Sequence, residues 1–109
     1  MKIEYSEKAR KWGESPTGQI VAKELKHALR RATDPIEIRW DRVEDANGRP
    51  VYELTLSDPK ASVTERFTPD EVETTRYAWD REYRLIRLWG DLQQVWSHQL
   101  LEEMKASRD

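Results

Sequence analysis

Cysteine is absent from the 109-residue chain, and long apolar runs are absent as well. Without cysteine the chain can form neither disulfide bonds nor thiolate nucleophiles or metal ligands. No apolar run follows the polar opening residues 1–5, so we expect no signal peptide. No stretch approaches the ~20 apolar residues that a membrane-spanning helix requires. A chain without cysteine is compatible with a reducing compartment, so we expect a cytoplasmic protein with no membrane partner.

Histidine and glycine are scarce, and neither supports a recognisable reaction centre. His27 and His98 fall in different expected helices, whereas a metal site needs three or four convergent ligands. The four glycines form no phosphate-binding loop of the type G-x-x-x-x-G-K-S/T, and no serine lies in a G-x-S-x-G elbow. Acid–base chemistry could use His98 or the pair Asp80 and Glu82, but residues two apart on a helix point to different faces. We expect no metal, no cofactor, no small-molecule substrate and no enzymatic activity.

Charged residues form 37% of the chain, yet the net charge is only −2. Residues 1–42 contain ten lysines and arginines against seven acidic residues, which gives a net charge of +3. Residues 43–109 contain nine against fourteen, which gives −5. This mild asymmetry is well short of the strongly basic balance of a dedicated nucleic-acid-binding domain.

Tryptophan is unusually frequent for so small a chain. Each indole buries about 150–250 Å² when it is covered, so a small core gains area by using large aromatic residues. The alternative is that some tryptophans remain exposed as anchors for a partner, a role in which this residue is enriched. We favour the core and leave the second role open. The five tryptophans are Trp12, Trp40, Trp79, Trp89 and Trp96.

The first expected helix begins near Ser15, because a serine cap followed by proline at the first helical position favours a helix start. It ends before Pro35, since proline disfavours helical geometry in the residue that precedes it. Between these limits the apolar residues recur with the period of one helical face. They are Val21, Leu25, Ala28, Leu29 and Ala32.

Two alternating segments, residues 36–43 and 51–56, are expected to form a hairpin with one buried face. A two-residue loop would place the apolar faces of the two strands on opposite sides, because a slip of one residue inverts every side chain. A three-residue loop that ends at Gly48 pairs Trp40 with Leu54 and joins the two faces. The sequence therefore predicts a type I turn with Gly48 in the left-handed region as a G1 bulge.

A third, less hydrophobic strand over residues 62–67 is expected at the edge of the sheet, since charged residues discourage edge-to-edge pairing. The fold class is then α+β with the order α-β-β-β-α. A three-stranded antiparallel meander packs against an N-terminal helix and a long C-terminal helix. We expect one domain over residues 16–109, preceded by an arm of residues 1–15 that docks through Tyr5 and Trp12.

This order of elements is similar in topology to that of double-stranded RNA-binding domains over residues 17 to about 90. That family carries basic residues at the start of its second helix. Here Pro69-Asp70-Glu71 takes that place, and its carboxylates would repel phosphate. We therefore do not assign the chain to that family.

The strongest local pattern lies at the start of the C-terminal helix. Thr68 and Glu71 form a capping box, and the flanking Phe67 and Val72 form the matching hydrophobic staple. The helical pattern then continues over residues 69–105. A straight helix of this length would span ~55 Å. It would overhang a domain whose radius of gyration is expected near ~13 Å.

Either the helix bends at Gly90 or its overhang packs on another copy, and we favour self-association, most simply as a homodimer. The predicted function is a non-enzymatic protein–protein interaction module. Its expected interface is Leu85, Leu88, Trp89, Leu92, Trp96 and Leu100. The expected core joins Trp40, Tyr52, Leu54 and Phe67 of the sheet to Leu25, Leu29, Val72, Trp79 and Ile86 of the helices.

The alternative function is nucleic-acid binding through a basic face of the first helix. Lysine and arginine residues recur there at helical spacing and could contact phosphates. The simpler interpretation is a solvated face opposite the apolar stripe, which the same spacing also demands. Nucleic acid is therefore a possible partner that we do not favour. The candidate phosphate-binding residues are Lys23, Lys26, Arg30 and Arg31.

Overall fold

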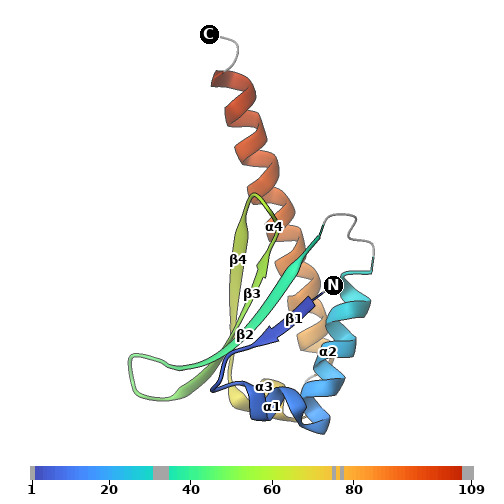
Figure 1. The fold of residues 1–109 in the computed structure, drawn as a ribbon, viewed down its shortest axis with the longest axis vertical. Coiled ribbons are helices and arrows are strands. Elements are labelled where there is room, and N and C mark those ends of the chain that lie inside the picture. The colour runs from blue at the N-terminus through green and yellow to red at the C-terminus, as the bar shows by residue number, and fades with distance from the viewer. Residues whose placement is uncertain (1, 31–34, 75, 77, 107–109) are drawn as a thin grey trace.

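The computed structural model describes residues 2–30, 35–74, 76 and 78–106 (Figure 1). Within the last helix, residues 96–101, 103 and 106 are described by their backbone alone. The α+β class is confirmed, but the sheet has four strands and is mixed. In chain order the elements are β1 (Lys2–Tyr5), α1 (Arg10–Glu14), α2 (Pro16–Ala28), β2 (Glu37–Glu44), β3 (Pro50–Ser57), β4 (Ser62–Phe67), α3 (Pro69–Glu73) and α4 (Ala78–Ala106).

The N-terminal residues, expected as an arm, are part of the sheet instead. Strand β1 pairs in parallel with β2, so that Ile3 lies opposite Ile38 and Tyr5 opposite Trp40. The chain crosses between these parallel strands through α1 and α2, as a parallel pair requires. Four residues are too few to display a convincing alternation, and a parallel partner beyond a helix leaves no hairpin signal in the sequence.

The expected docking residues Tyr5 and Trp12 do pack against the core. Trp12 is buried, and the centroid of its ring lies 6.1 Å from that of Tyr5. Its indole Nε1 donates a hydrogen bond to the carbonyl oxygen of Val72 at 3.0 Å. Gly13 permits this packing, because a Cβ atom there would stand 2.6 Å from the Tyr5 ring.

The hairpin between β2 and β3 has the predicted register. Trp40 lies opposite Leu54 and Ile38 opposite Leu56, and these are the two apolar pairs of the buried face. The amide of Asp45 donates to the carbonyl of Arg49 at 2.8 Å, and Gly48 has a φ of +74°. The three-residue loop with a left-handed glycine is therefore confirmed. Strand β4 is at the edge of the sheet, as predicted, and β1 forms the other edge.

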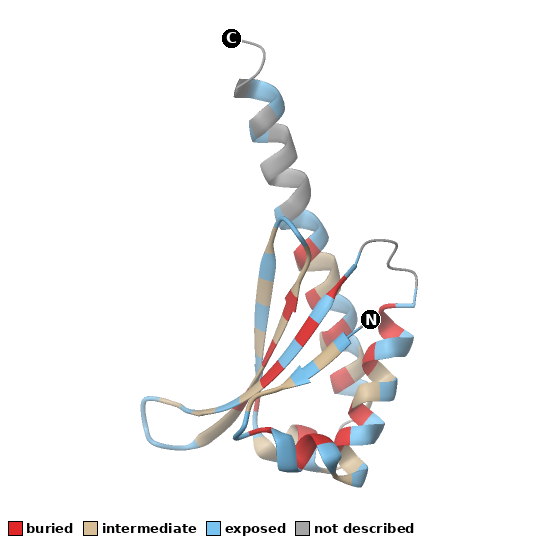
Figure 2. Ribbon diagram, in the orientation of Figure 1, coloured by how far each residue is buried: buried red, intermediate tan, exposed pale blue. Residues whose placement is uncertain are grey.

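Helices α2 and α4 lie side by side against one face of the sheet (Figure 1). Helix α2 begins at the predicted cap, where the Ser15 hydroxyl accepts a hydrogen bond from the amide of Gly18 at 3.1 Å. Figure 2 shows buried residues alternating with less buried ones along β2 and recurring along α2 and α4. The largest apolar side chains that are fully buried are Trp40, Tyr52, Phe67, Leu25, Leu29, Ile38, Leu54, Leu56, Leu85 and Leu92.

The predicted capping box is present, but the predicted continuous helix over residues 69–105 is not. The Thr68 hydroxyl accepts from the amide of Glu71 at 3.3 Å, and Glu71 Oε1 accepts from the amide of Thr68 at 2.9 Å. Helix α3 then ends, because Thr74 adopts an extended backbone with ψ of 163°. The threonine hydroxyl donates to the carbonyl of Asp70 at 2.9 Å and so competes with the helical ladder. The helix is interrupted at Thr74 and not at Gly90, which lies inside α4.

Helix α4 contains 29 residues and is ~44 Å long at 1.5 Å per residue. Its C-terminal part extends beyond the β3–β4 turn, and within the described chain no other element lies beside it (Figure 1). The molecule accordingly measures 52 × 32 × 24 Å. The overhang that the sequence predicted is therefore present, although the helix starts nine residues later, at Ala78 instead of Pro69.

The break at Thr74 also rotates α4 relative to the predicted helix. Steps of three or four residues along an unbroken helix from Val72 lead to Trp79 and Ile86, which is why both were expected in the core. Both predictions are wrong, because Trp79 is 86% and Ile86 49% exposed. Leu85 lies in the core in their place.

Candidate functional site

Helix α4 carries two apolar faces. The inner face contains Leu85, Leu88 and Leu92, which are almost fully buried against the sheet and α2. These three belong to the predicted interface, and the domain's own core covers them in place of a partner. Trp89 is half-buried at the margin of this core. The remaining predicted interface residues, Trp96 and Leu100, have side chains outside the described set.

The second apolar face points into solvent, where a surface helix normally carries charged residues. It consists of Trp79, Tyr83, Ile86 and Gly90, which recur at intervals of four, three and four residues and so lie along one line of the helix. We call these four residues the outer stripe. Trp79 is 86% exposed, Tyr83 67% and Ile86 49%. Two aromatic rings and a branched aliphatic chain are therefore open to a partner.

Gly90 is the unusual member of the outer stripe. A glycine inside a helix destabilises it by about 0.5–1 kcal/mol relative to alanine. Gly48 has the positive φ of a turn, and Gly18 lies where a Cβ atom would stand 2.1 Å from the Trp12 carbonyl oxygen. Neither reason applies to Gly90, which has no positive φ and whose added Cβ would have no neighbour within 4 Å. Nothing in the described part of the chain requires a glycine there.

A buried arginine fixes the orientation of α4. Arg81 is only 2% exposed and forms a two-point ion pair with Glu24 of α2. Its Nη1 atom donates to the carbonyl oxygens of Glu71 at 2.7 Å and Thr74 at 3.0 Å. These are carbonyl groups that the early end of α3 leaves without helical partners. The Arg81 side chain thus supplies hydrogen bonds to backbone carbonyls at the break between α3 and α4. Because Arg81 is buried, the opposite side of α4, which carries the outer stripe, faces solvent.

A second arginine, Arg84, ties the same helix to the edge strand. Its guanidinium contacts the carboxylates of Glu65, at 2.6 Å, and Glu71, and it lies 4.1 Å from the centroid of the Phe67 ring. These partners lie on β4 and α3, far from Arg84 along the chain. Neither arginine network was predicted from the sequence. The position of Arg81 could have indicated burial, because it lies on the same helical face as Leu85, Leu88 and Leu92.

Glu71 is held ionised by these contacts. Partial burial acts to raise the pKa of its carboxyl, but hydrogen bonds from Thr68 and the pairing with Arg84 outweigh that effect, so the pKa is lowered from its usual 4.5. The same carboxylates hold the pKa of Arg84 above its ordinary value, although burial alone would lower it. The capping box and the anchor of α4 are therefore one charged network.

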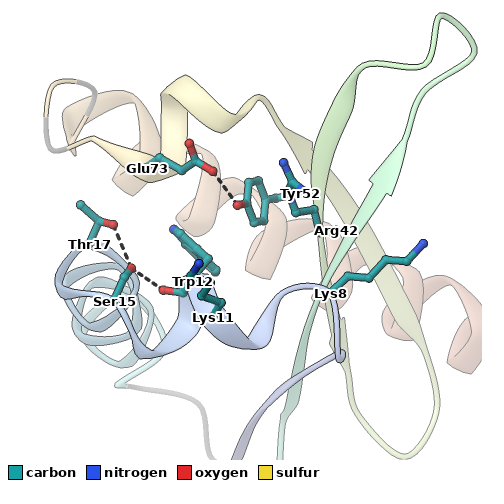
Figure 3. A pocket seen from close by; sticks show the side chains of 8 residues that line it. All are labelled: Lys8, Lys11, Trp12, Ser15, Thr17, Arg42, Tyr52 and Glu73. Atoms are coloured by element: carbon teal, nitrogen blue, oxygen red, sulfur yellow. Dashed lines mark hydrogen bonds between the residues drawn. The ribbon is translucent and has the colours of Figure 1, made fainter.

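A hollow of about 360 Å³ lies between α1, the start of α2 and the β2–β3 hairpin (Figure 3). The Tyr52 hydroxyl donates to Glu73 Oε1 at 2.7 Å. Burial, aided by Glu73, raises the pKa of Tyr52 to about 12, so the phenol stays protonated at neutral pH and is no general base. Lys8 extends away from Tyr52 (Figure 3). The Ser15 hydroxyl is bonded to the Thr17 hydroxyl and the Trp12 carbonyl, so the residues that line the hollow place no nucleophile beside a base.

The predicted basic face is on the surface of α2. Lys23, Lys26 and Arg30 are exposed, whereas Arg31 lies outside the described residues. A hollow of about 310 Å³ adjoins them between α2 and α4, and Glu24 and Glu82 line it together with Lys23. Lys23 therefore stands beside carboxylates.

Other site classes find little support. His27 is exposed on α2, and the described residues contain no group of three or more histidine, aspartate or glutamate side chains that could hold a metal ion. Over the same part of the chain, none of the helices has both the length and the apolar composition needed to cross a membrane. No family model, no curated protein and no solved structure matches the chain.

Proposed function

We propose that this protein is a non-enzymatic interaction module that self-associates through the outer stripe of α4. The observation that carries the proposal is the exposure of Trp79, Tyr83 and Ile86 along one line of a helix. Contiguous apolar surface of this kind is rare on monomeric proteins and is typical of protein–protein contacts.

The free energy of burying apolar area favours a partner that covers the outer stripe. Covering about 150–250 Å² of one indole at ~25 cal/mol per Å² is worth roughly 4–6 kcal/mol before the entropy of association is subtracted. Aromatic residues at the centre of an interface commonly supply most of its binding free energy. Trp79 and Tyr83 have the character of such residues, and Arg81 and Arg84 hold the helix that presents them.

Sedimentation velocity across micromolar concentrations tests the proposal. The wild-type chain should approach twice the mass of one chain as its concentration rises, and Trp79→Lys or Ile86→Lys should remain a monomer. The matched control is Ile20→Lys, since Ile20 is 40% exposed on α2 and receives the same chemical change away from the stripe. A wild-type chain that stays monomeric throughout this range would remove the proposal.

Nucleic-acid binding through α2 is the alternative, supported by the exposure of Lys23, Lys26 and Arg30. The neighbouring Glu82 weakens it, because its carboxylate lowers the positive potential near Lys23. If the alternative holds, Lys26→Gln and Arg30→Gln should weaken binding to DNA or RNA and flatten its salt dependence. Trp79→Lys should then leave that binding unchanged, which separates the two functions.

A further inference from the structure

The spacing of the outer stripe reads the same in both directions. From Trp79 to Tyr83 is four residues, from Tyr83 to Ile86 three, and from Ile86 to Gly90 four again. When a second α4 lies antiparallel with its centre between Tyr83 and Ile86, Trp79 of each copy faces Gly90 of the other. Tyr83 then faces Ile86. The largest side chain of the stripe meets the smallest, at both ends of the contact.

A parallel arrangement lacks this fit. It would place the two Trp79 side chains against each other and leave the two Gly90 positions facing across a gap. Helices pack when side chains of one fill the depressions of the other, at axial separations of 8–10 Å. Gly90 is such a depression, because no atom of the described chain fills the place of its missing side chain. The antiparallel pairing gives that otherwise unexplained glycine a role.

Charge on the flank of the stripe agrees with the antiparallel order. Asp80 and Arg87 lie on the flank that faces β4, and Arg87 makes only a long contact of 3.8 Å to Glu65 while 57% of its side chain is exposed. In a two-fold symmetric contact, the same surface patch of each copy meets the other. Asp80 of one copy would then stand near Arg87 of the other, twice per dimer. In a two-fold parallel pair this flank of one copy would lie on the opposite side of the contact from the same flank of the other, so Asp80 and Arg87 would not meet.

We propose that a second copy of this chain packs antiparallel on the outer stripe, with Trp79 of each copy seated over Gly90 of the other. This inference rests on the proposed function and adds its geometry and symmetry. The two pairs of aromatic rings would cover about 600–1,000 Å² in total, below the ~1,200–2,000 Å² of a standard specific interface. An interface of this size belongs to the class of small contacts, so association is tested up to high micromolar concentrations.

Gly90→Ala is the first test. In the free chain the new methyl group meets nothing, so the substitution should raise the thermal midpoint of a dilute, monomeric sample. In the dimer the same methyl group would stand where Trp79 of the other copy packs, so the dissociation constant should rise at least about tenfold. The matched control is Lys26→Ala, which also places alanine in a helix, at an exposed site on α2, and should leave association unchanged.

Disulfide capture is the second test, and the chain has no cysteine of its own that could form competing disulfides. Equal amounts of an Asp80→Cys chain and an Arg87→Cys chain are mixed and oxidised. Antiparallel pairing predicts the mixed disulfide as the main product, because positions 80 and 87 of opposite copies come within about 3 Å along the helix axis. Two-fold parallel pairing places these positions of the two copies on opposite sides of the contact and predicts no mixed disulfide.

The outcomes separate this inference from the proposal beneath it. If the wild-type chain is monomeric at all concentrations, both fail. If it dimerises while Gly90→Ala binds as tightly as the wild type and the mixed disulfide does not form, self-association stands and the antiparallel Trp79–Gly90 contact is overturned. Weakened association of Gly90→Ala together with the mixed disulfide supports the contact.

Discussion

The carboxylate of Glu24 and the guanidinium of Arg81 meet across the α2–α4 contact at two points. Arg81 Nε lies 2.9 Å from Glu24 Oε2, and Nη2 lies 2.8 Å from Oε1. Arg81 is buried while Glu24 keeps partial access to solvent. Without Glu24, the positive charge of Arg81 would be buried with no counter-charge. The orientation of α4, and with it the direction of the outer stripe, depends on this contact.

Removing the carboxylate of the Glu24–Arg81 pair should strongly destabilise the fold. Glu24→Gln leaves a buried guanidinium without its counter-charge, and we expect a loss of ~3–5 kcal/mol in the free energy of unfolding. Urea denaturation measures it, with Glu82→Gln on the facing helix as the control. A loss below ~0.5 kcal/mol for Glu24→Gln would show that Arg81 does not depend on this partner.

The two faces of α4 should respond oppositely to substitution. Leu85→Ala removes buried atoms from the core and should cost ~2–5 kcal/mol of unfolding free energy. Trp79→Gln removes an exposed ring and should change the stability of the monomer by no more than ~0.5 kcal/mol. Denaturation of dilute samples, in which the chain is monomeric, measures both. A large loss for Trp79→Gln would indicate that the ring packs inside the domain.

Acid should destabilise the fold partly through Glu71. Its carboxyl has a lowered pKa in the folded chain, so the folded state binds this proton more weakly than the unfolded state does. The stability it contributes is therefore present above the ordinary pKa of 4.5 and is lost as the pH falls through the lower, folded value. In Glu71→Gln, which retains a capping-box residue without the charge, the unfolding free energy should fall less steeply with acid. Equal slopes for the two chains would exclude this role.

Alkaline solution should act through Tyr52. Its pKa is raised to about 12, because burial and the hydrogen bond to Glu73 disfavour the phenolate. The unfolded chain ionises near the ordinary value of 10.0, so the contribution of this group is complete below that pH and is lost as the pH rises through about 12. Ultraviolet titration should show a late tyrosine step that disappears in Tyr52→Phe. A titration curve unchanged by that substitution would contradict the assignment.

Local chemistry was sufficient to predict several elements of this fold. The pairing of Trp40 with Leu54 followed from alternation, since only one loop length joins the two apolar faces. The left-handed Gly48 and the Thr68–Glu71 capping box followed from preferences of residues close together in the sequence. Each of these features depends on neighbours within a few residues, or on a single hairpin, and such preferences are visible without a tertiary structure.

The break at Thr74 and the direction of α4 were decided by the tertiary structure. Arg81 satisfies carbonyl groups of α3 and the carboxylate of Glu24, which is 57 residues away, so no local pattern contains that information. The sequence by itself determined that this helix would be long and apolar on more than one side. Packing against the sheet and α2 then selected Leu85 for the core and left Trp79 in solvent, because only one of two apolar faces can be buried by so small a domain.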